Sequence, residues 1–439
     1  MKTTLPKIAP TVVRDEAQQI RELFERNVVP SYGRFDLVLE RGDGSYVWDV
    51  GGRRYLDFGA GIAVCALGHA HPEITGVLHE QSSKLVHVSN LYYNELQGRL
   101  AERLVNLIGP GRCFFCNSGA EANEGLFKLA RKFGHDQGRY EVITTIESFH
   151  GRTLAGISAT GQEKVKKGFE PMVDGFKQVP FNDLEAMRCA LTPQSAAILI
   201  EPIQGESGVT IATAEYLIGL RRLCDDHNLL LLFDEVQAGH FRTGKFHSWQ
   251  TIVDAASSRV PEGKRQDTSS TYVPDGISMA KALGNGFPMG AFWVRDKFAD
   301  LLGPGSHATT FGGTPLACAV ALKILEVMER DQLPENALCI GSFLKRELQD
   351  LQQRYPTFIR AVRGFGLMLG IEFVPDFPAF RADGRTAAIQ VVNRLHEKNL
   401  LTVPAGTAIV RLLPPLNLSR SEAEEGLTAI TAVVEELNG

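Results

Sequence analysis

Lys281 is the residue whose surroundings point most directly to chemistry. Small residues flank it, and a Gly-rich turn runs on to Gly286. This setting predicts an amine that lies close to the backbone and is partly dehydrated, which disfavours its ammonium form. A neutral amine can form a Schiff base with an aldehyde. Asp234 ends an apolar run and supplies the carboxylate that a pyridinium nitrogen needs. A single lysine is more often a solvated surface group, but together the two residues indicate pyridoxal phosphate (PLP).

A second segment has the composition of a phosphate site. Ser118, Gly119 and Ala120 lie between a predicted strand and a predicted helix. Small residues there let backbone N–H groups and the Ser118 hydroxyl approach an anion at the helix N-terminus. The alternative is an ordinary helix start, with Ser118 as N-cap and Glu121 completing a capping box. The segment alone leaves both interpretations open.

Two further strand ends carry candidate binding residues. Phe149 can stack on a cofactor ring, and Arg152 can hold a carboxylate through two hydrogen bonds. Glu206 follows another strand and is a candidate partner for a substrate-binding arginine. In isolation, a packed phenylalanine, a solvated arginine and a loop carboxylate remain open alternatives.

Other chemistries have weaker support in the sequence. Gly239–Lys245 matches the G-x-x-x-x-G-K pattern of a nucleotide-binding loop, but Phe246 stands where magnesium binding needs Ser or Thr. No G-x-G-x-x-G opens a helix, which disfavours a nicotinamide dehydrogenase. Cys113 and Cys116 form a C-x-x-C within a predicted strand, which favours core packing over a metal or redox role. His69–His71 is predicted to be a turn, and no metal site is expected.

Bulk properties favour a soluble enzyme. The chain has 439 residues, enough for two domains or for one large domain with additions. A hydrophobic fraction of 44% is ordinary for a globular protein, and a net charge of -5 offers no basic field for nucleic acid or membrane. No apolar run approaches the ~20 residues that span a bilayer, and residues 1–18 lack the apolar core of a secretory signal. Seven cysteines, an odd number, favour free thiols. A cytoplasmic location is expected.

Short apolar runs alternate with helical patterns, which predicts an α/β fold with a mostly parallel sheet covered by helices. The predicted strands of this sheet are Cys113–Cys116, Val142–Ile146, Ala196–Glu201, Leu229–Phe233 and Ala291–Val294, and the predicted helices are Glu121–Phe133, Ala214–His227 and Leu316–Arg330. Arg41–Tyr55 is predicted to be a hairpin, and Ala255–Thr271 an exposed loop. Strands Met368–Val374 and Ile409–Leu413 indicate a smaller C-terminal unit.

Taken in order, these segments resemble the class III (omega) aminotransferases of PLP fold type I. The resemblance runs from about Tyr32 to Arg420. Its landmarks are Leu67–Pro72, Ser89–Tyr93, Phe115–Glu124, Phe149–Thr153, Asp234–Gln237, Ala280–Lys281, Thr309–Pro315 and Arg411–Leu416. It implies an N-terminal segment at 1–66, a large PLP-binding domain at 67–325 and a C-terminal small domain at 326–439, with the terminal segments forming a smaller α+β domain.

The resemblance also implies roles for individual residues. Lys281 would carry PLP and move a proton, and Asp234 would pair with the pyridine nitrogen. The other implied cofactor contacts are Gln237 at the ring hydroxyl, Phe149 and Val236 on the ring faces, Ser118, Gly119 and Ala120 at the phosphate, and Thr310 from the neighbouring subunit of a homodimer. The implied substrate contacts are Arg152, Arg411, Glu206, Thr309 and Tyr32.

Within this family the likeness is greatest to the acetylornithine aminotransferases. It implies amino transfer from N2-acetylornithine to 2-oxoglutarate, with ornithine, succinylornithine, succinyldiaminopimelate and 4-aminobutyrate as alternative donors. A nucleotide binder and a catalytically inactive relative are the alternatives from other classes. His240 and Phe241 depart from the family, in which a smaller residue and then glycine are usual, and Ala255–Thr271 resembles an insertion.

Overall fold

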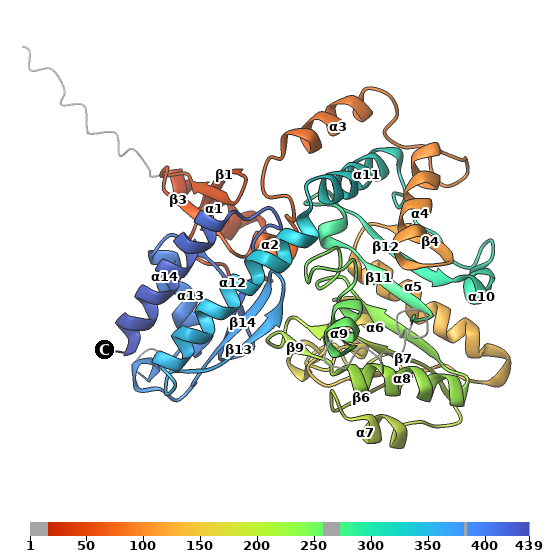
Figure 1. The fold of residues 1–439 in the computed structure, drawn as a ribbon. Coiled ribbons are helices and arrows are strands. Elements are labelled where there is room, and N and C mark those ends of the chain that lie inside the picture. The colour runs from red at the N-terminus through yellow and green to blue at the C-terminus, as the bar shows by residue number, and fades with distance from the viewer. Residues whose placement is uncertain (1–15, 258–272, 382–383, 439) are drawn as a thin grey trace, which may run out of the picture.

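The computed structural model describes residues 16–257, 273–381 and 384–438. Figure 1 shows two groups of elements: a large sheet with its helices, and the C-terminal elements lying beside the first strands of the chain. The α/β fold class predicted from the sequence is confirmed. The predicted domain boundaries, between residues 66 and 67 and between residues 325 and 326, stay predictions.

The large group is built on a seven-stranded sheet. Its spatial order is β4 (Gly111–Cys116), β12 (Gly290–Arg295), β11 (Gly276–Met279), β10 (Leu230–Asp234), β7 (Ser195–Ile200), β5 (Glu141–Thr145) and β6 (Phe176–Val179). Strand β12 is antiparallel to both of its neighbours, and the other pairs are parallel. The carboxyl ends of the six remaining strands therefore meet at one edge, which is where ligands bind in open α/β sheets.

The central strands are apolar because helices cover both faces of the sheet. Every residue of β7 and β10 is buried, as the uninterrupted apolar runs predicted. The predicted helices are observed as α5 (Gly119–Gly134), α8 (Ala214–His227) and α11 (Pro315–Arg330). Two strands were missed: β6 lies at the edge and is half polar, and β11 is short and begins with glycine.

A smaller four-stranded sheet forms near the C-terminus. Its order is β13 (Ile359–Phe365), β14 (Met368–Phe373), β17 (Ile409–Leu412) and β16 (Val403–Ala405), and its helices are α12 (Leu333–Arg354), α13 (Ala387–Glu397) and α14 (Arg420–Asn438). All of its strand pairs are antiparallel. The predicted strands Met368–Val374 and Ile409–Leu413 agree with β14 and β17 to within one residue.

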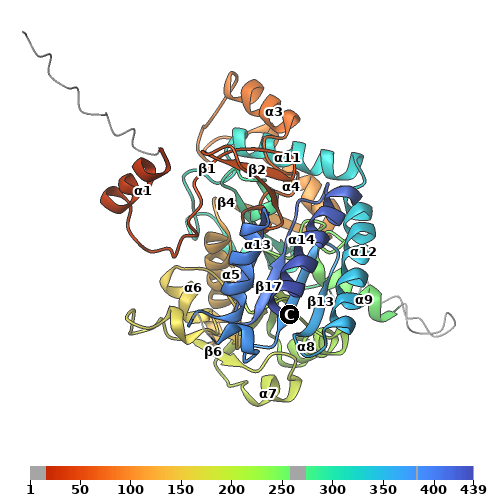
Figure 2. The ribbon, with the colours of Figure 1, turned by 90° about the vertical axis from the view of Figure 1, so that its left-hand side faces the viewer.

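The two ends of the chain share a third sheet. Strands β1 (Leu39–Asp43), β2 (Tyr46–Asp49) and β3 (Arg54–Asp57) form an antiparallel meander, so the predicted Arg41–Tyr55 hairpin was incomplete. Strand β3 then pairs in parallel with β15 (Leu400–Leu401), which joins the terminal segments as the fold class requires. Helix α1 (Glu16–Asn27) lies at the periphery (Figure 2), where its Arg21 donates to Asp36 Oδ1 at 2.6 Å.

The remaining elements connect these sheets. They are α2 (Ala60–Ala63), α3 (Pro72–Ser82), α4 (Glu95–Ile108), α6 (Leu154–Ala159), α7 (Leu184–Cys189), β8 (Ile203–Gln204), β9 (Thr210–Ile211), α9 (Ser248–Ser257) and α10 (Asp296–Ala299). The predicted loop Ala255–Thr271 starts too early, because its first three residues are the last residues of α9. The rest of the predicted loop, 258–271, lies outside the described residues. All seven cysteines are free thiols, including the Cys113–Cys116 pair. In the described ranges, no helix is long and apolar enough to cross a membrane.

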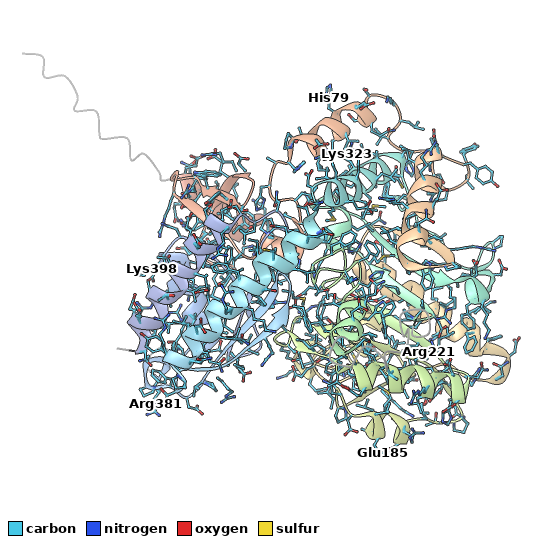
Figure 3. All side chains as sticks on the ribbon, in the orientation of Figure 1. His79, Glu185, Arg221, Lys323, Arg381 and Lys398 are labelled. Atoms are coloured by element: carbon cyan, nitrogen blue, oxygen red, sulfur yellow. The ribbon has the colours of Figure 1, made fainter. Side chains whose placement is uncertain are left out.

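A buried ion pair fixes the strands that lead to the cavity. Arg221, labelled in Figure 3 on α8, donates to Asp275 Oδ2 over 2.8 Å. The same carboxylate oxygen accepts from Leu231 N at 2.9 Å, so it ties the start of β11 to β10. Both side chains are almost fully buried, which makes loss of either partner costly.

Candidate active site

The carboxyl edge of the large sheet holds a cavity of about 410 Å³. Its wall comes from the ends of β4, β5, β7, β10 and β11 and the turns that follow them. Nine of the predicted site residues line it: Ser118, Gly119, Ala120, Phe149, Arg152, Asp234, Val236, Gln237 and Lys281. The sheet topology thus brings together residues that are far apart in the sequence.

Lys281 follows β11 and lines this cavity. Its backbone is in a left-handed conformation, with φ of 49°. For a residue other than glycine, this conformation is uncommon and costs energy. Burial lowers the pKa of the Lys281 amine to about 8, although the nearby Glu206 carboxylate acts in the opposite direction. A larger fraction of the amine than in an ordinary lysine is therefore neutral and nucleophilic near physiological pH.

Asp234 ends β10 with its carboxylate held on both oxygens. Oδ2 accepts from Asn123 Nδ2 at 2.7 Å and lies 2.9 Å from His150 Nδ1, while Oδ1 accepts from the Val236 amide at 3.1 Å. Only 5% of Asp234 is exposed. The carboxylate is thus fixed in the cavity wall, as a partner for a positively charged nitrogen requires.

Ser118 caps the N-terminus of α5. Its hydroxyl accepts from the Glu121 amide at 3.2 Å, so Ser118 is the N-cap of this helix, and its phosphate role stays a prediction. Glu121 reaches back to the Asn117 amide at 3.0 Å, which differs by one residue from the expected capping box. A Cβ at Gly119 would lie 2.8 Å from Val236 Cγ1, so glycine is needed for this close approach.

A hydrogen-bonded group adjoins the cavity through Gln237. Arg411 Nη1 donates to Glu206 Oε1 at 2.8 Å and to Gln237 Oε1 at 2.9 Å, and Gln237 Nε2 donates to Glu206 Oε1 at 3.0 Å. Burial raises the pKa of Glu206, but the Arg411 charge outweighs it and lowers the pKa to about 2. Arg411, with 1% exposed, is therefore neutralised by an ionised carboxylate.

Phe149 and Arg152 lie together at the cavity wall. The Arg152 guanidinium carbon lies 5.6 Å from the centre of the Phe149 ring. The Phe149 amide donates to Glu201 Oε2 at 2.9 Å. Burial, and next the nearby Asp234 charge, hold the pKa of Glu201 well above its usual value.

The structure places three other predicted residues outside the cavity wall of this chain. Thr309 adjoins the wall, because its hydroxyl accepts from Asn117 Nδ2 at 3.2 Å and Asn117 lines the cavity. Thr310 is exposed. Tyr32 is 74% exposed and lies beside Arg34. Their roles stay predictions.

The nucleotide-binding alternative fails on geometry. Lys245 lies at the surface with its amine 3.2 Å from the Asp254 carboxylate. Helix α9 begins three residues later, at Ser248, so no helix N-terminus follows the lysine directly as a phosphate-binding loop requires. The segment from Gly239 to Lys245 is a packed turn.

Comparison with known proteins agrees with this site. Residues 28–434 match the family described as aminotransferase class-III. The chain belongs to the class III aminotransferases. It is 43% identical over 421 residues to the acetylornithine aminotransferase of Gloeobacter violaceus, covering 95% of this chain and 98% of that one.

Two solved structures of aminotransferases have the same fold. The N-acetylornithine aminotransferase from Stenotrophomonas maltophilia aligns with a TM-score of 0.76 and 35% identity, covering 94% of this chain and 98% of that one. The ornithine aminotransferase from Toxoplasma gondii aligns with a TM-score of 0.85 and 30% identity, covering 98% and 97%, and its structure contains PLP at partial occupancy.

Membership of the class III aminotransferases implies PLP as the cofactor, and the cavity fits it. The fit rests on a nucleophilic amine at Lys281, a buried carboxylate at Asp234 and a helix N-terminus at Ser118 with room for an anion. All three residues line one cavity, and they offer a partner in kind for the aldehyde, the pyridine nitrogen and the phosphate of PLP.

The sequence interpretation gave no role to several residues of this class III site. Asn123 and His150 hold Asp234, Glu201 holds the Phe149 amide, and Asn117 links the cavity to Thr309. His150 lies beside Phe149, where a strand-end signal was available. Asn123 is in the first turns of α5, and only the folded structure reveals that it faces β10.

Proposed function

We propose that this class III aminotransferase transfers the side-chain amino group of N2-acetylornithine to 2-oxoglutarate, giving N-acetylglutamate 5-semialdehyde and glutamate. The observation that carries the proposal is its 43% identity to a protein named acetylornithine aminotransferase, with nearly full coverage of both chains. The ornithine aminotransferase from Toxoplasma gondii is 30% identical over a similar span. The reaction would serve arginine biosynthesis.

In the proposed site, each cofactor group meets a matching protein group. Lys281 would bind the aldehyde carbon, and the Asp234 carboxylate would pair with the pyridine nitrogen. Gln237 would contact the ring hydroxyl, and Phe149 and Val236 would pack against the ring. Ser118, Gly119 and Ala120 hold the phosphate at the N-terminus of α5, where the helix dipole favours an anion.

Lys281 is the proposed proton carrier of the reaction. When bound, PLP supplies an aldehyde to carry the amino group and an electron-accepting ring. Lys281 takes the proton from the amine-bearing carbon of the donor and returns it at the cofactor side. Its lowered pKa, about 8, leaves more of the amine able to accept a proton near neutral pH than in an ordinary lysine. Asp234 keeps the ring nitrogen protonated.

Two substrates of different shape use the site in turn. We propose that Arg152 holds the donor carboxylate, since it lines the cavity and is not held by the Glu206 group. Arg411 would hold the second carboxylate of 2-oxoglutarate after Glu206 releases it. While Glu206 stays paired, Arg411 has no net charge to offer, which suits a donor with a neutral acyl group. Thr309 and Tyr32 are the proposed remaining contacts.

We further propose a homodimer in which Thr310 completes the neighbouring site. Large apolar side chains are exposed beside Thr310: Leu91 is 83% exposed, Tyr92 69% and Phe311 62%. The two segments lie against each other, since Asn90 Nδ2 donates to Gly312 O at 3.0 Å. A second copy that covers this surface would bury these groups. A cytoplasmic location stays a prediction.

The test is a comparison of kcat/KM for N2-acetylornithine, ornithine, succinylornithine and 4-aminobutyrate, each with 2-oxoglutarate. N2-acetylornithine is expected to have the highest value. A higher value for ornithine or 4-aminobutyrate would contradict the proposed donor while leaving the aminotransferase chemistry intact.

A further inference from the structure

Arg242 is a fully buried arginine that is not part of the cavity wall. It is 1% exposed, and burial lowers its pKa to about 10. Its Nε and Nη2 atoms have no hydrogen-bond partner within the described part of the chain. Burying a guanidinium without a carboxylate is costly, so the contacts it does make need a reason.

Those contacts reach the smaller sheet. Arg242 Nη1 donates to Leu367 O at 3.1 Å and also to Pro414 O. The backbone contributes as well, because Leu367 N donates to Arg242 O at 3.0 Å. One residue of the large group thus holds two separate segments of the C-terminal group.

Both contacted residues lie just beyond the strands that meet at Arg411. Pro414 follows Arg411 by three residues and lies two residues past the end of β17. On the neighbouring strand β14, Gly370 is the cross-strand partner of Arg411, and Leu367 precedes it by three residues. Arg242 therefore contacts the residues just beyond β14 and β17 at the same end of the pair, three residues from Arg411 and from its cross-strand partner Gly370.

The backbone of Arg242 is linked by hydrogen bonds to the residues that follow Asp234 at the end of β10. Arg242 N donates to Gly239 O at 3.4 Å, and Gly239 N donates to Glu235 O at 3.0 Å. Glu235 is itself fixed, since its carboxylate accepts from Ser248 N at 3.1 Å. A short chain of contacts thus runs from the end of β10 to both strands beside Arg411.

We propose that Arg242 is a positioning residue, whose guanidinium sets the distance of Arg411 from the cavity by holding Leu367 and Pro414 together. It acts through Arg411 and touches neither substrate nor cofactor. The inference rests on the proposed function, in which Arg411 holds a substrate carboxylate. Lysine at this position keeps the charge but lacks the planar fork, so it should leave the strands less firmly placed.

The test measures binding of glutarate, a dicarboxylate that cannot accept an amino group, to the holoenzyme by calorimetry. Arg242→Lys is expected to raise the Kd for glutarate about tenfold, which equals about 1.4 kcal/mol. The matched control is Lys245→Met, which removes a cation from the same turn at an exposed position and should leave the Kd unchanged. The absorbance of the bound cofactor should be the same in all variants.

A double-mutant cycle separates positioning from general loss of structure. In an Arg411→Met background, Arg242→Lys should have no further effect on the Kd for glutarate. Additive effects in the cycle, or no effect of Arg242→Lys alone, would overturn the proposal. Because glutarate binding does not depend on the donor, a wrong donor assignment would leave this result untouched.

A second variant approaches the same contact from the opposite side and serves if Arg242→Lys fails to fold. Gly366 has φ of 52°, and a Cβ there would lie 2.5 Å from Arg242 O. Gly366→Ala should therefore displace Leu367 from Arg242 and weaken glutarate binding in the same direction. An unchanged Kd in a folded Gly366→Ala protein would also overturn the proposal.

Discussion

His150 Nδ1 lies 2.9 Å from Asp234 Oδ2, and both side chains are buried at the carboxyl edge of the sheet. The same oxygen accepts from Asn123 Nδ2 at 2.7 Å. Three segments far apart in the sequence thus meet at one carboxylate oxygen, and two groups fix its direction. A carboxylate held in this way has its remaining oxygen aimed by the protein before any ligand arrives.

The first prediction concerns Asn123. Replacing it with leucine removes a hydrogen bond to a charged group, worth about 1.5–3 kcal/mol. We expect Asn123→Leu to raise the Kd for PLP by at least tenfold, measured from the absorbance of retained cofactor during dialysis. The matched control is Asn336→Leu, because Asn336 donates to Leu416 O at 2.7 Å away from the cavity. That variant should lower stability and keep the affinity for PLP; equal losses of affinity in both variants would contradict the role of Asn123.

The second prediction concerns the Lys281 amine. In cofactor-free protein, amine-directed acylation at Lys281 should increase as pH rises through about 8, because burial lowers its pKa. An unperturbed lysine titrates near ~10.4. Peptide mass spectrometry after brief labelling gives the midpoint, with surface lysines in the same digest as reference. Glu206→Gln should move the midpoint lower, since the Glu206 charge raises the pKa of Lys281. A midpoint above 10 would show that the amine is not dehydrated.

The third prediction concerns Arg152. Arg152→Ala removes the cation that lines the cavity beside Phe149 and should raise the KM of the amino donor by at least tenfold. The absorbance of the bound cofactor should stay normal, because Arg152 is not among its proposed contacts. Steady-state kinetics at saturating 2-oxoglutarate measures the effect. An unchanged KM would remove Arg152 from its assigned role.

The sequence picked out residues that the structure places at one cavity, but not the groups that hold them. Local sequence patterns identify three of these residues: a Gly-rich turn follows Lys281, an apolar strand ends at Asp234, and Ser118 begins a helix. Asn123 carries no such signal, because its role depends on which face of α5 meets β10. Thr310 and Tyr32 raise a different problem, since their predicted partner is a second chain.

Fold prediction succeeded where the hydrophobic signal was strong. Strands β7 and β10 were predicted because burial on both faces demands unbroken apolar runs. Strand β11 was not predicted, because the local propensity of its sequence, Gly-Ile-Ser-Met, for a strand is weak. The strand is stabilised by its neighbouring strands and by the Asp275 contacts.

The fourth prediction concerns the pH dependence of stability at His69. Hydrogen bonding to Asp57, with His69 Nε2 2.8 Å from Asp57 Oδ2, raises the pKa of His69 to about 10. A raised pKa contributes stability that is complete below the unfolded pKa of 6.5 and is lost as pH rises through about 10. His69→Gln should therefore lower the free energy of unfolding by about 2 kcal/mol at pH 6 and by little at pH 10.

Urea titrations at the two pH values measure that difference. The control is His79→Gln, since His79 is an exposed histidine near the C-terminal end of α3 (Figure 3). Its replacement should have a small effect at both pH values. A loss for His69→Gln that is independent of pH would mean that the imidazole contributes packing and not charge.

The last prediction concerns Phe241, which occupies a left-handed conformation with φ of 64° where the family resemblance leads us to expect glycine. A left-handed backbone costs about 1–2 kcal/mol for a residue other than glycine. Phe241 is, however, only 7% exposed, and its ring centre lies 5.2 Å from that of Phe246. Truncating a buried phenylalanine costs about 3–5 kcal/mol, so packing outweighs strain.

In urea unfolding we expect the parent protein with Phe241 to be the most stable, followed by Phe241→Gly and then by Phe241→Ala. Alanine loses the ring and keeps the unfavourable backbone, so it should be less stable than glycine by about 1–2 kcal/mol, less the entropy that glycine adds to the unfolded chain. A glycine variant more stable than the parent would show that strain dominates at this turn.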